Sequence, residues 1–170
     1  MLTVPIATLV IAAFACLCDL RTRRIPNTLT FGAAGAAVVF HLFTGGVGGG
    51  ALAVGGWFVG IALMFGLYAL GGLGAGDVKL LGALGAWLGP VGAVWVVLYT
   101  GISGGIIALV VAAMHGYLTQ ACRNLWSLLA YWRLAGIRPM AELTLDTSRG
   151  PRLAYATSIL AGTVATLWLH

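Results

Sequence analysis

The sequence predicts an all-α, polytopic membrane protein with six transmembrane helices and one further helix at the membrane surface. Its 170 residues are 61% hydrophobic and only 8% charged, whereas a soluble domain carries about 25% charged residues. So few charges cannot cover a globule, and lipid must therefore be part of the solvent. The apolar runs are continuous and do not alternate with polar residues, which favours helices over a β-barrel. The length suits one integral-membrane domain over 1–170.

Six apolar segments give the predicted spans. A helix needs about 20 residues to cross a bilayer, and the fourth segment is short by this measure. Gly89-Pro90 is expected to end that segment in a tight turn that leads into the fifth. The predicted helices cover 2–18, 28–43, 51–70, 78–89, 92–114 and 153–169.

The basic residues predict how these helices are oriented. All nine Lys and Arg residues fall in the first, third and fifth connections or just inside the fourth helix. The connection at 44–50 and the Gly89-Pro90 turn contain none. By the positive-inside rule, the charged side is cytoplasmic and both termini lie outside. A count of five or seven helices would place arginines on both faces, so the asymmetry favours six.

Two further patterns concern packing and the membrane surface. Segment 119–134 is expected to lie in the headgroup region as an anchor, with contact to a substrate as the alternative. It combines two tryptophans with two arginines: Trp126, Trp132, Arg123 and Arg133. Residues 136–152 are expected to form a loop. Glycines four residues apart predict close packing of the third, fourth and fifth helices. These pairs are Gly56/Gly60, Gly85/Gly89 and Gly101/Gly105.

Only four side chains are acidic, and two of them are expected at the same depth in the membrane. Glu142 and Asp146 belong to the polar loop and are expected to be surface charges. Asp19 ends the first helix, which runs inward, and Asp77 begins the fourth, which runs outward. Both therefore lie near the cytoplasmic boundary, where two carboxylates distant in sequence can meet.

Two carboxylates at this depth suggest acid–base chemistry. A buried carboxylate is costly without a partner, and two neighbours cannot both ionise comfortably. One pKa rises and the pair shares a proton. One carboxylate then acts as a base toward water and the other as an acid toward a carbonyl. We expect an Asp19/Asp77 pair that bridges one water and needs no metal and no cofactor.

Each aspartate also has a structural interpretation. Asp77 could serve as a helix N-cap, a position that favours aspartate. Asp19 could form a boundary ion pair with Arg21 or Arg23. Taken together, their equal depth favours the catalytic pair.

Residues beside the aspartates are expected to support the site. Glycine at 74 and 76 permits positive φ and close approach, and a substrate strand could pair with the main chain there. Lys79 could bind a lipid headgroup, orient its helix or lower the pKa of an aspartate. Pro26 suits a first helical turn, and Asn27 or Thr28 could cap it, which would make a rigid loop that holds Asp19.

Two stretches resemble the type IV prepilin peptidases, which are GxGD-type intramembrane aspartyl proteases. They are DLRTRRIPNTLT at 19–30 and GAGDVKLLGALGAWLG at 74–89. A weaker similarity lies in LAYATSILAG at 153–162, which resembles the family's Pro-Tyr-x-x-Ala-Ile segment. Ala154 stands where the family often has proline.

The resemblance implies a function. Such enzymes remove the short basic leader of pilin-like precursors at the cytoplasmic face of the bacterial inner membrane, usually after a glycine. Asp19 and Asp77 would be the catalytic aspartates. Larger members carry an N-terminal cytoplasmic region with CxxC pairs, which is associated with N-methylation. Here the 19–27 connection is short and the three cysteines form no CxxC pair. The chain thus resembles the peptidase-only form found with Flp (Tad) pilus systems, and N-methylation is not expected.

The expected partners are prepilin or pseudopilin precursors and the lipid bilayer. The net charge of +5 is explained by topology and anionic lipid, and no nucleic-acid partner is expected. A homo-oligomer is compatible with the sequence. Two other functions are open: a small ion-coupled transporter, because intramembrane acids mark ion paths, and a non-catalytic membrane assembly subunit.

Overall fold

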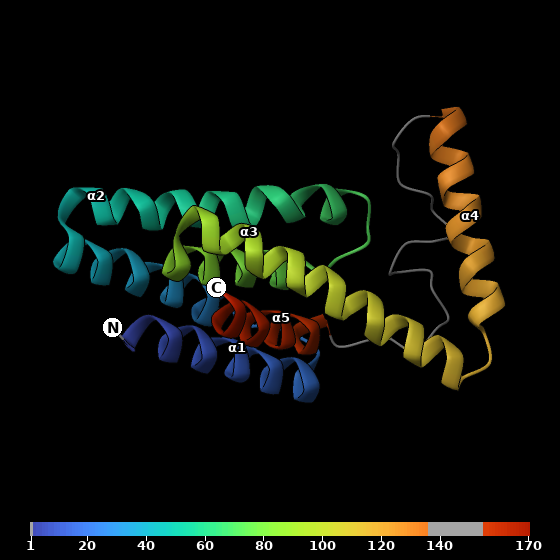
Figure 1. Cartoon of the computed structure of the whole chain (residues 1–170), viewed down its shortest axis with the longest axis horizontal. Coiled ribbons are helices and arrows are strands. Elements are labelled where there is room, and N and C mark those ends of the chain that lie inside the picture. The colour runs from blue at the N-terminus through green and yellow to red at the C-terminus, as the bar shows by residue number, and fades with distance from the viewer. Residues whose placement is uncertain (1, 136–154) are drawn as a thin grey trace.

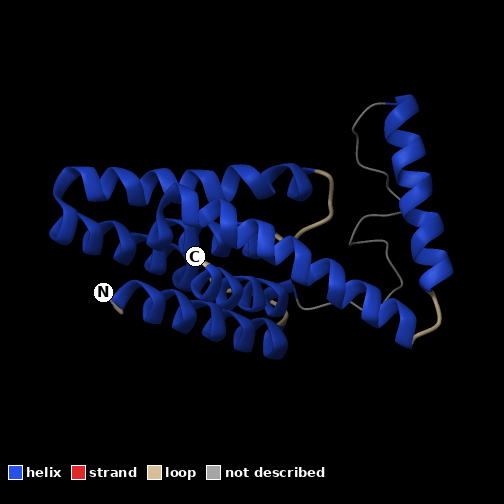
Figure 2. Ribbon diagram, viewed as in Figure 1, coloured by secondary structure: helices blue, strands red, loops and turns tan. Residues whose placement is uncertain are grey.

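The computed structural model describes residues 2–135 and 155–170, and this part of the chain contains helices and short connections but no strand (Figure 2). The all-α prediction is therefore confirmed for these residues. The loop expected at 136–152, with Glu142 and Asp146, lies outside them. The helices are α1 (Thr3–Thr22), α2 (Asn27–Ala69), α3 (Ala75–Met114), α4 (Leu118–Ala135) and α5 (Tyr155–Leu169).

The two longest helices each fold back on themselves (Figure 1). The reversal in α2 occurs at Gly46, with φ 62° and ψ −156°, and the reversal in α3 at Gly89, with φ 73° and ψ 177°. Glycine reaches these positive φ values at no steric cost. The turn predicted at Gly89-Pro90 is thus present. The loop predicted at 44–50 was wrong, because every residue there except Gly46 is helical.

The number of helices also differs from the prediction. Three helices of the described chain, α1, α2 and α3, are long and apolar enough to cross a membrane. The expectation was six separate spans, but α2 has 43 residues and α3 has 40, each about twice the ~20 that one crossing needs. The reason is that a single non-helical residue, and no loop, divides each of them. The separate helix expected at 119–134 is present as α4, which stands beside the bundle (Figure 1).

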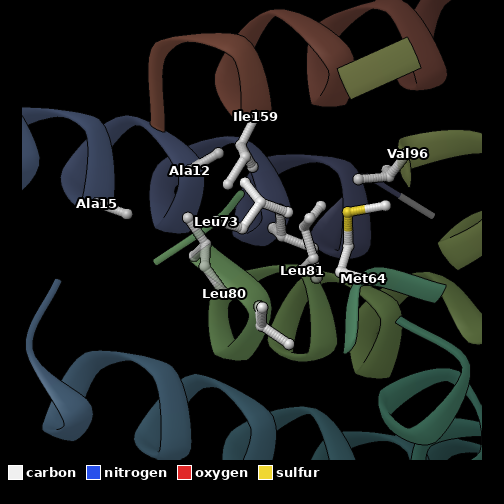
Figure 3. Close-up of a cluster of buried hydrophobic side chains, with 10 residues drawn as sticks. Ala12, Ala15, Met64, Leu73, Leu80, Leu81, Val96 and Ile159 are labelled. Atoms are coloured by element: carbon white, nitrogen blue, oxygen red, sulfur yellow. The ribbon is translucent and has the colours of Figure 1, made fainter. Parts of the chain in front are cut away.

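The first half of α3 forms the centre of the bundle. Residues 80–87 are all buried, so this segment is covered on every side. Figure 3 shows Leu80 and Leu81 surrounded by side chains from three other parts of the chain. These include Ala12 from α1, Met64 from α2 and Ile159 from α5. Asp77 begins this central segment, so its position is set by the core.

Glycines allow α2 and α3 to touch through their backbones. A Cβ added at Gly56 would meet the carbonyl oxygen of Gly85, and one at Gly60 would meet the carbonyl oxygen of Leu81. This confirms the close packing predicted from the first two glycine pairs. The close packing predicted at the third pair was wrong, because a Cβ at Gly101 or Gly105 would meet nothing within 4 Å.

Polar side chains add specific links between the helices. The Nε2 atom of His41 lies 3.0 Å from the carbonyl oxygen of Trp87, and the indole N–H of Trp87 donates to the carbonyl oxygen of Ala33 at 3.0 Å. These bonds join the first halves of α2 and α3. Ser103 Oγ donates to the carbonyl oxygen of Ser158 at 2.9 Å and joins α3 to α5.

The outer faces of the bundle are apolar. Large hydrophobic side chains on α1, such as Val10 and Phe14, are more than half exposed, as are Phe43 and Phe58 on α2. Contiguous apolar surface of this kind is rare on soluble monomers. The outer surface therefore fits a membrane protein.

Replacing Gly56 by alanine is expected to destabilise the protein, because the new Cβ would press on the Gly85 carbonyl in a contact between two backbones. We expect a loss of about 1–3 kcal/mol. The matched control is Gly66→Ala, which lies in the same helix and has nothing within 4 Å of the added atom. Thermal unfolding in detergent measures both variants. Equal melting temperatures for the two would contradict the backbone contact.

Candidate active site

Asp19 lies in the last turn of α1, beside an unusual helix end. The chain leaves α1 through Arg23, whose φ of 52° and ψ of 31° are left-handed. The Arg23 N–H donates to the carbonyl oxygen of Asp19 at 2.8 Å. Glycine is usual where a helix ends in this conformation, and a non-glycine residue there is uncommon. Arg23 therefore adopts a backbone conformation that is costly for a residue with a side chain, at the edge of a cavity that both aspartates line.

Asp77 lies in the first turn of α3, three residues after the capping residue Gly74. The N–H of Gly74 donates to the Asp77 carboxylate. In return, the N–H of Asp77 donates to the Gly74 carbonyl oxygen, with 3.1 Å between nitrogen and oxygen. This is half of a capping box, in which the third helical residue bonds back to the cap. The interpretation of Asp77 as the N-cap itself was therefore wrong. The helix N-terminus also favours a negative charge at this position.

The two aspartates line the same cavity. Its volume is about 300 Å³, and its other lining residues come from the α1–α2 loop and the start of α3: Arg23, Arg24, Ile25, Gly74, Ala75 and Gly76. Both carboxyl-bearing residues are half-buried, and they are close enough to interact electrostatically. The fold thus brings together two acids that are far apart in the sequence.

The arginines at this end of the bundle leave the aspartates unpaired. Arg23 and Arg24 are exposed at the cavity. Between 2 and 135, and between 155 and 170, no basic side chain lies within ion-pair distance of Asp19 or Asp77. The proposed boundary ion pair of Asp19 with Arg21 or Arg23 was therefore wrong.

The α1–α2 loop, residues 23–26, packs against the start of α3. A Cβ added at Gly76 would lie 3.2 Å from the Cβ of Ile25, so a side chain here would press on the loop and require it to shift by a few tenths of an ångström. Lys79 Nζ donates to the side-chain oxygen of Asn27 at 2.9 Å. The same Nζ lies 5.4 Å from the centre of the Phe31 ring.

The start of α2 differs from the predicted cap. Pro26 occupies the capping position with extended backbone, and no side chain caps the helix. The Leu29 N–H instead donates to the Pro26 carbonyl oxygen at 3.1 Å. The expectation that Asn27 or Thr28 caps α2 was wrong, and the oxygen of Asn27 is bonded to Lys79.

The glycines at 74 and 76 do not have the expected positive φ, although Gly76 allows the close approach of Ile25. Gly74 has φ −77°, Gly76 is helical, and the positive φ in this connection belongs to Gly71. The N–H of Gly72 already donates to the Leu67 carbonyl oxygen at 2.9 Å. Both main-chain groups of Gly74 are also bonded, so a substrate strand that paired at Gly72 or Gly74 would have to displace these bonds.

Tyr155 is a third polar residue near the aspartates. It begins α5, is half-buried, and interacts electrostatically with Asp77. A Cβ at Gly104 would lie 3.3 Å from its ring, which shows how closely α5 approaches α3. Its position near Asp77 was not predicted from the sequence, where the signals were a polar side chain at the head of an apolar helix and the weak resemblance at 153–162.

The model of the type IV leader peptidase family matches residues 6–109. This range includes most of α1, all of α2 and most of α3, and with them both aspartates. The chain belongs to the type IV leader peptidase family. No curated protein and no solved structure matches it.

Membership of the type IV leader peptidase family supports the assignment of this chain as a leader-peptidase-like protease. The apolar helices of the chain fit a membrane protein. The match ends before α4 and α5, so Tyr155 lies outside it. In the described part of the chain, no three His, Cys, Asp or Glu side chains group as metal ligands. The polar groups of the cavity are the two carboxylates and the neighbouring arginines.

Gly76→Ala is expected to impair peptidase activity with little change in stability. The added Cβ would push Ile25 and shift the loop that borders the cavity, and we expect about a tenfold loss of leader cleavage. The control is Gly32→Ala, an exposed α2 position with nothing within 4 Å of the new atom. Precursor cleavage in detergent, together with a melting temperature, measures both. Full activity in Gly76→Ala would contradict this account of the loop.

Proposed function

We propose that the protein is an aspartic endopeptidase of the bacterial inner membrane that removes the basic leader from pilin-like precursors. One observation carries this proposal: Asp19 and Asp77, from different helices, line one cavity in a chain that belongs to a leader peptidase family. We further propose that the described helices form one domain.

In the proposed reaction the two aspartates share one proton and hold a water between them. The ionised carboxylate takes a proton from water, whose oxygen attacks the scissile carbonyl carbon. The other aspartate gives its proton to the carbonyl oxygen, and a tetrahedral diol forms. The C–N bond then breaks as the first aspartate returns its proton to the leaving nitrogen. A diol hydroxyl restores the proton of the second aspartate.

The surroundings of Asp77 support this chemistry. Its carboxylate accepts the Gly74 N–H and sits in the first turn of α3, so its orientation is set before substrate arrives. Positioned groups of this kind contribute to rate because no reorganisation is needed during the reaction. Among residues 2–135 and 155–170, no arginine forms an ion pair that would have to be broken before either aspartate can act.

We propose that α1, the two halves of α2, the two halves of α3, and α5 make six crossings. Figure 1 shows both reversals at the end of the bundle opposite the α1–α2 loop. That loop carries Arg23 and Arg24, and Arg21 and Lys79 lie close to it. The positive-inside rule then places the cavity at the cytoplasmic face and both termini outside.

The substrate fits this location. A pilin-like precursor has a basic leader followed by an apolar helix, so the bond between them lies at the cytoplasmic boundary. The cavity is proposed to lie at the same depth. We propose that the protein is of the peptidase-only form that acts in Flp (Tad) systems, and that it does not methylate its product.

Asn substitution of either aspartate is expected to abolish cleavage. In Asp19→Asn or Asp77→Asn one member of the acid–base pair is lost, and we expect the rate to fall by about 10²–10⁴-fold. Glu142→Gln is the matched control, because it removes one acid from the long polar connection. Leader removal from a co-expressed candidate pilin, read by mass, measures all three.

Two outcomes would contradict the proposed function. One is full cleavage in either Asn variant while the protein remains inserted. The other is an uncut precursor with the wild type across a panel of candidate pilins, which is what an ion-coupled transporter or an assembly subunit would give.

The proposed topology predicts opposite labelling of two positions. In a cysteine-free background, a cysteine at Gly48, which is exposed next to the α2 reversal, should react with an impermeant maleimide on intact cells. A cysteine at Arg21, which is exposed at the end of α1, should react only after the inner membrane is opened. Labelling of both from the same side would contradict six crossings in this orientation.

A further inference from the structure

We propose that Lys79 is a positioning residue of the active site: its bond to Asn27 holds the α1–α2 loop against the start of α3 and thereby sets the spacing of Asp19 and Asp77. This inference rests on the proposed function, because it concerns the same pair of aspartates. It assigns Lys79 to the loop, and not to a lipid headgroup or to the acids themselves.

Lys79 reaches from α3 to two residues at the start of α2. Its Nζ donates to Asn27 Oδ1 at 2.9 Å and lies 5.4 Å from the centre of the Phe31 ring. A hydrogen bond from a charged donor is stronger than a neutral one, and a cation near an aromatic ring adds attraction. Lys79 thus binds two successive turns at the start of α2. Its neighbours Val78 and Leu80 are buried, so α3 cannot rotate to release it.

The second step concerns what else holds the loop. α1 and α2 make far fewer contacts with each other than either makes with α3. Beside the contacts of α1 with α5, contacts of the loop with α3 therefore help to hold the end of α1 and the start of α2 together. These contacts include Gly76 against Ile25 and Lys79 with Asn27. Residues three apart share one face of a helix, so the first turns of α3 present Gly76 and Lys79 together toward the loop.

The third step connects the loop to both aspartates. Arg23, the first loop residue, donates its N–H to the carbonyl oxygen of Asp19 at 2.8 Å, so movement of the loop displaces the last turn of α1. Asp77 follows Gly76 directly on α3. A link between Asn27 and α3 therefore controls how far the Asp19 side chain stands from that of Asp77.

Lys79 acts through Asn27 and not on the reacting atoms. It does not line the cavity, and it makes no ion pair with either aspartate in the described chain. Its two observed partners are instead an amide oxygen and an aromatic ring, both on α2.

The test compares Lys79→Met, Asn27→Ala and the double variant in precursor cleavage. Loss of alignment should lower kcat about tenfold and change KM less than about twofold. Asn27→Ala should come close to Lys79→Met, and the double variant should be no slower than Lys79→Met, because the bond between Lys79 and Asn27 is removed in all three. Lys79→Arg and Asn27→Asp, which keep a donor and an acceptor, should recover most of the rate.

Arg21→Met is the matched control, because it removes one exposed cation at the same boundary, outside the cavity. It should cleave like the wild type. Wild-type kcat in Lys79→Met, or effects of Lys79→Met and Asn27→Ala that multiply in the double variant, would overturn the proposal. So would a pH profile shifted by Lys79→Met but not by Asn27→Ala, or a defect that varies with the anionic lipid content of the vesicles.

A second measurement does not depend on proteolysis. In a cysteine-free background, spin labels are placed at Thr28 on α2 and Ala75 on α3, both exposed. They report the distance between the start of α2, directly after the loop, and the start of α3. Lys79→Met should broaden the distance distribution, and Arg21→Met should leave it unchanged. An unchanged distribution in Lys79→Met would overturn the positioning role. Absence of cleavage in the wild type, with the broadening present, would count against the proposed protease and leave the link between Lys79 and Asn27 supported.

Discussion

The structure depends on the absence of side chains where the second half of α2 crosses the first half of α3. Gly56 and Gly85 meet there through their backbones, and Gly60 meets the carbonyl of Leu81. In lipid, helices gain no hydrophobic energy by associating, so close van der Waals packing has to supply the attraction. A methyl group at this crossing would separate two backbones and forfeit much of that attraction, because dispersion weakens steeply with distance.

The same crossing determines where the aspartates lie. With α2 packed on one side and α1 and α5 on the others, residues 80–87 of α3 are all buried. Asp77 is at the start of this enclosed segment and cannot move independently of it. Ala12 and Ala15, both 0% exposed, pack in the same core cluster as Val78 and Leu80 of α3, so Asp19, at the end of α1, lies near the start of α3. The polar cavity is thus a consequence of tight packing among small residues.

Several features could be predicted from the sequence because they depend on local pattern. Continuous apolar runs predict helices, and the opposite directions of the first and fourth segments predict that Asp19 and Asp77 lie at one end. Other features depend on contacts between distant segments. The glycine-rich stretch 44–50 suggests a loop because glycine is a poor helix former. In the structure it is nevertheless helical, and Gly49 and Gly50 pack on His41 and Leu42. The partner of Asn27 could not be predicted either, because Lys79 reaches it from another helix.

The reversal at Gly46 has a consequence for how this chain tolerates changes in length. A loop of several residues absorbs an insertion, but here one residue separates two helical segments. Each residue of an α-helix turns the chain by about 100°. Adding or removing a single residue between Gly46 and Gly56 would rotate the following segment and direct its glycines away from Gly85. The number of residues in this stretch is therefore as strictly constrained as their identity.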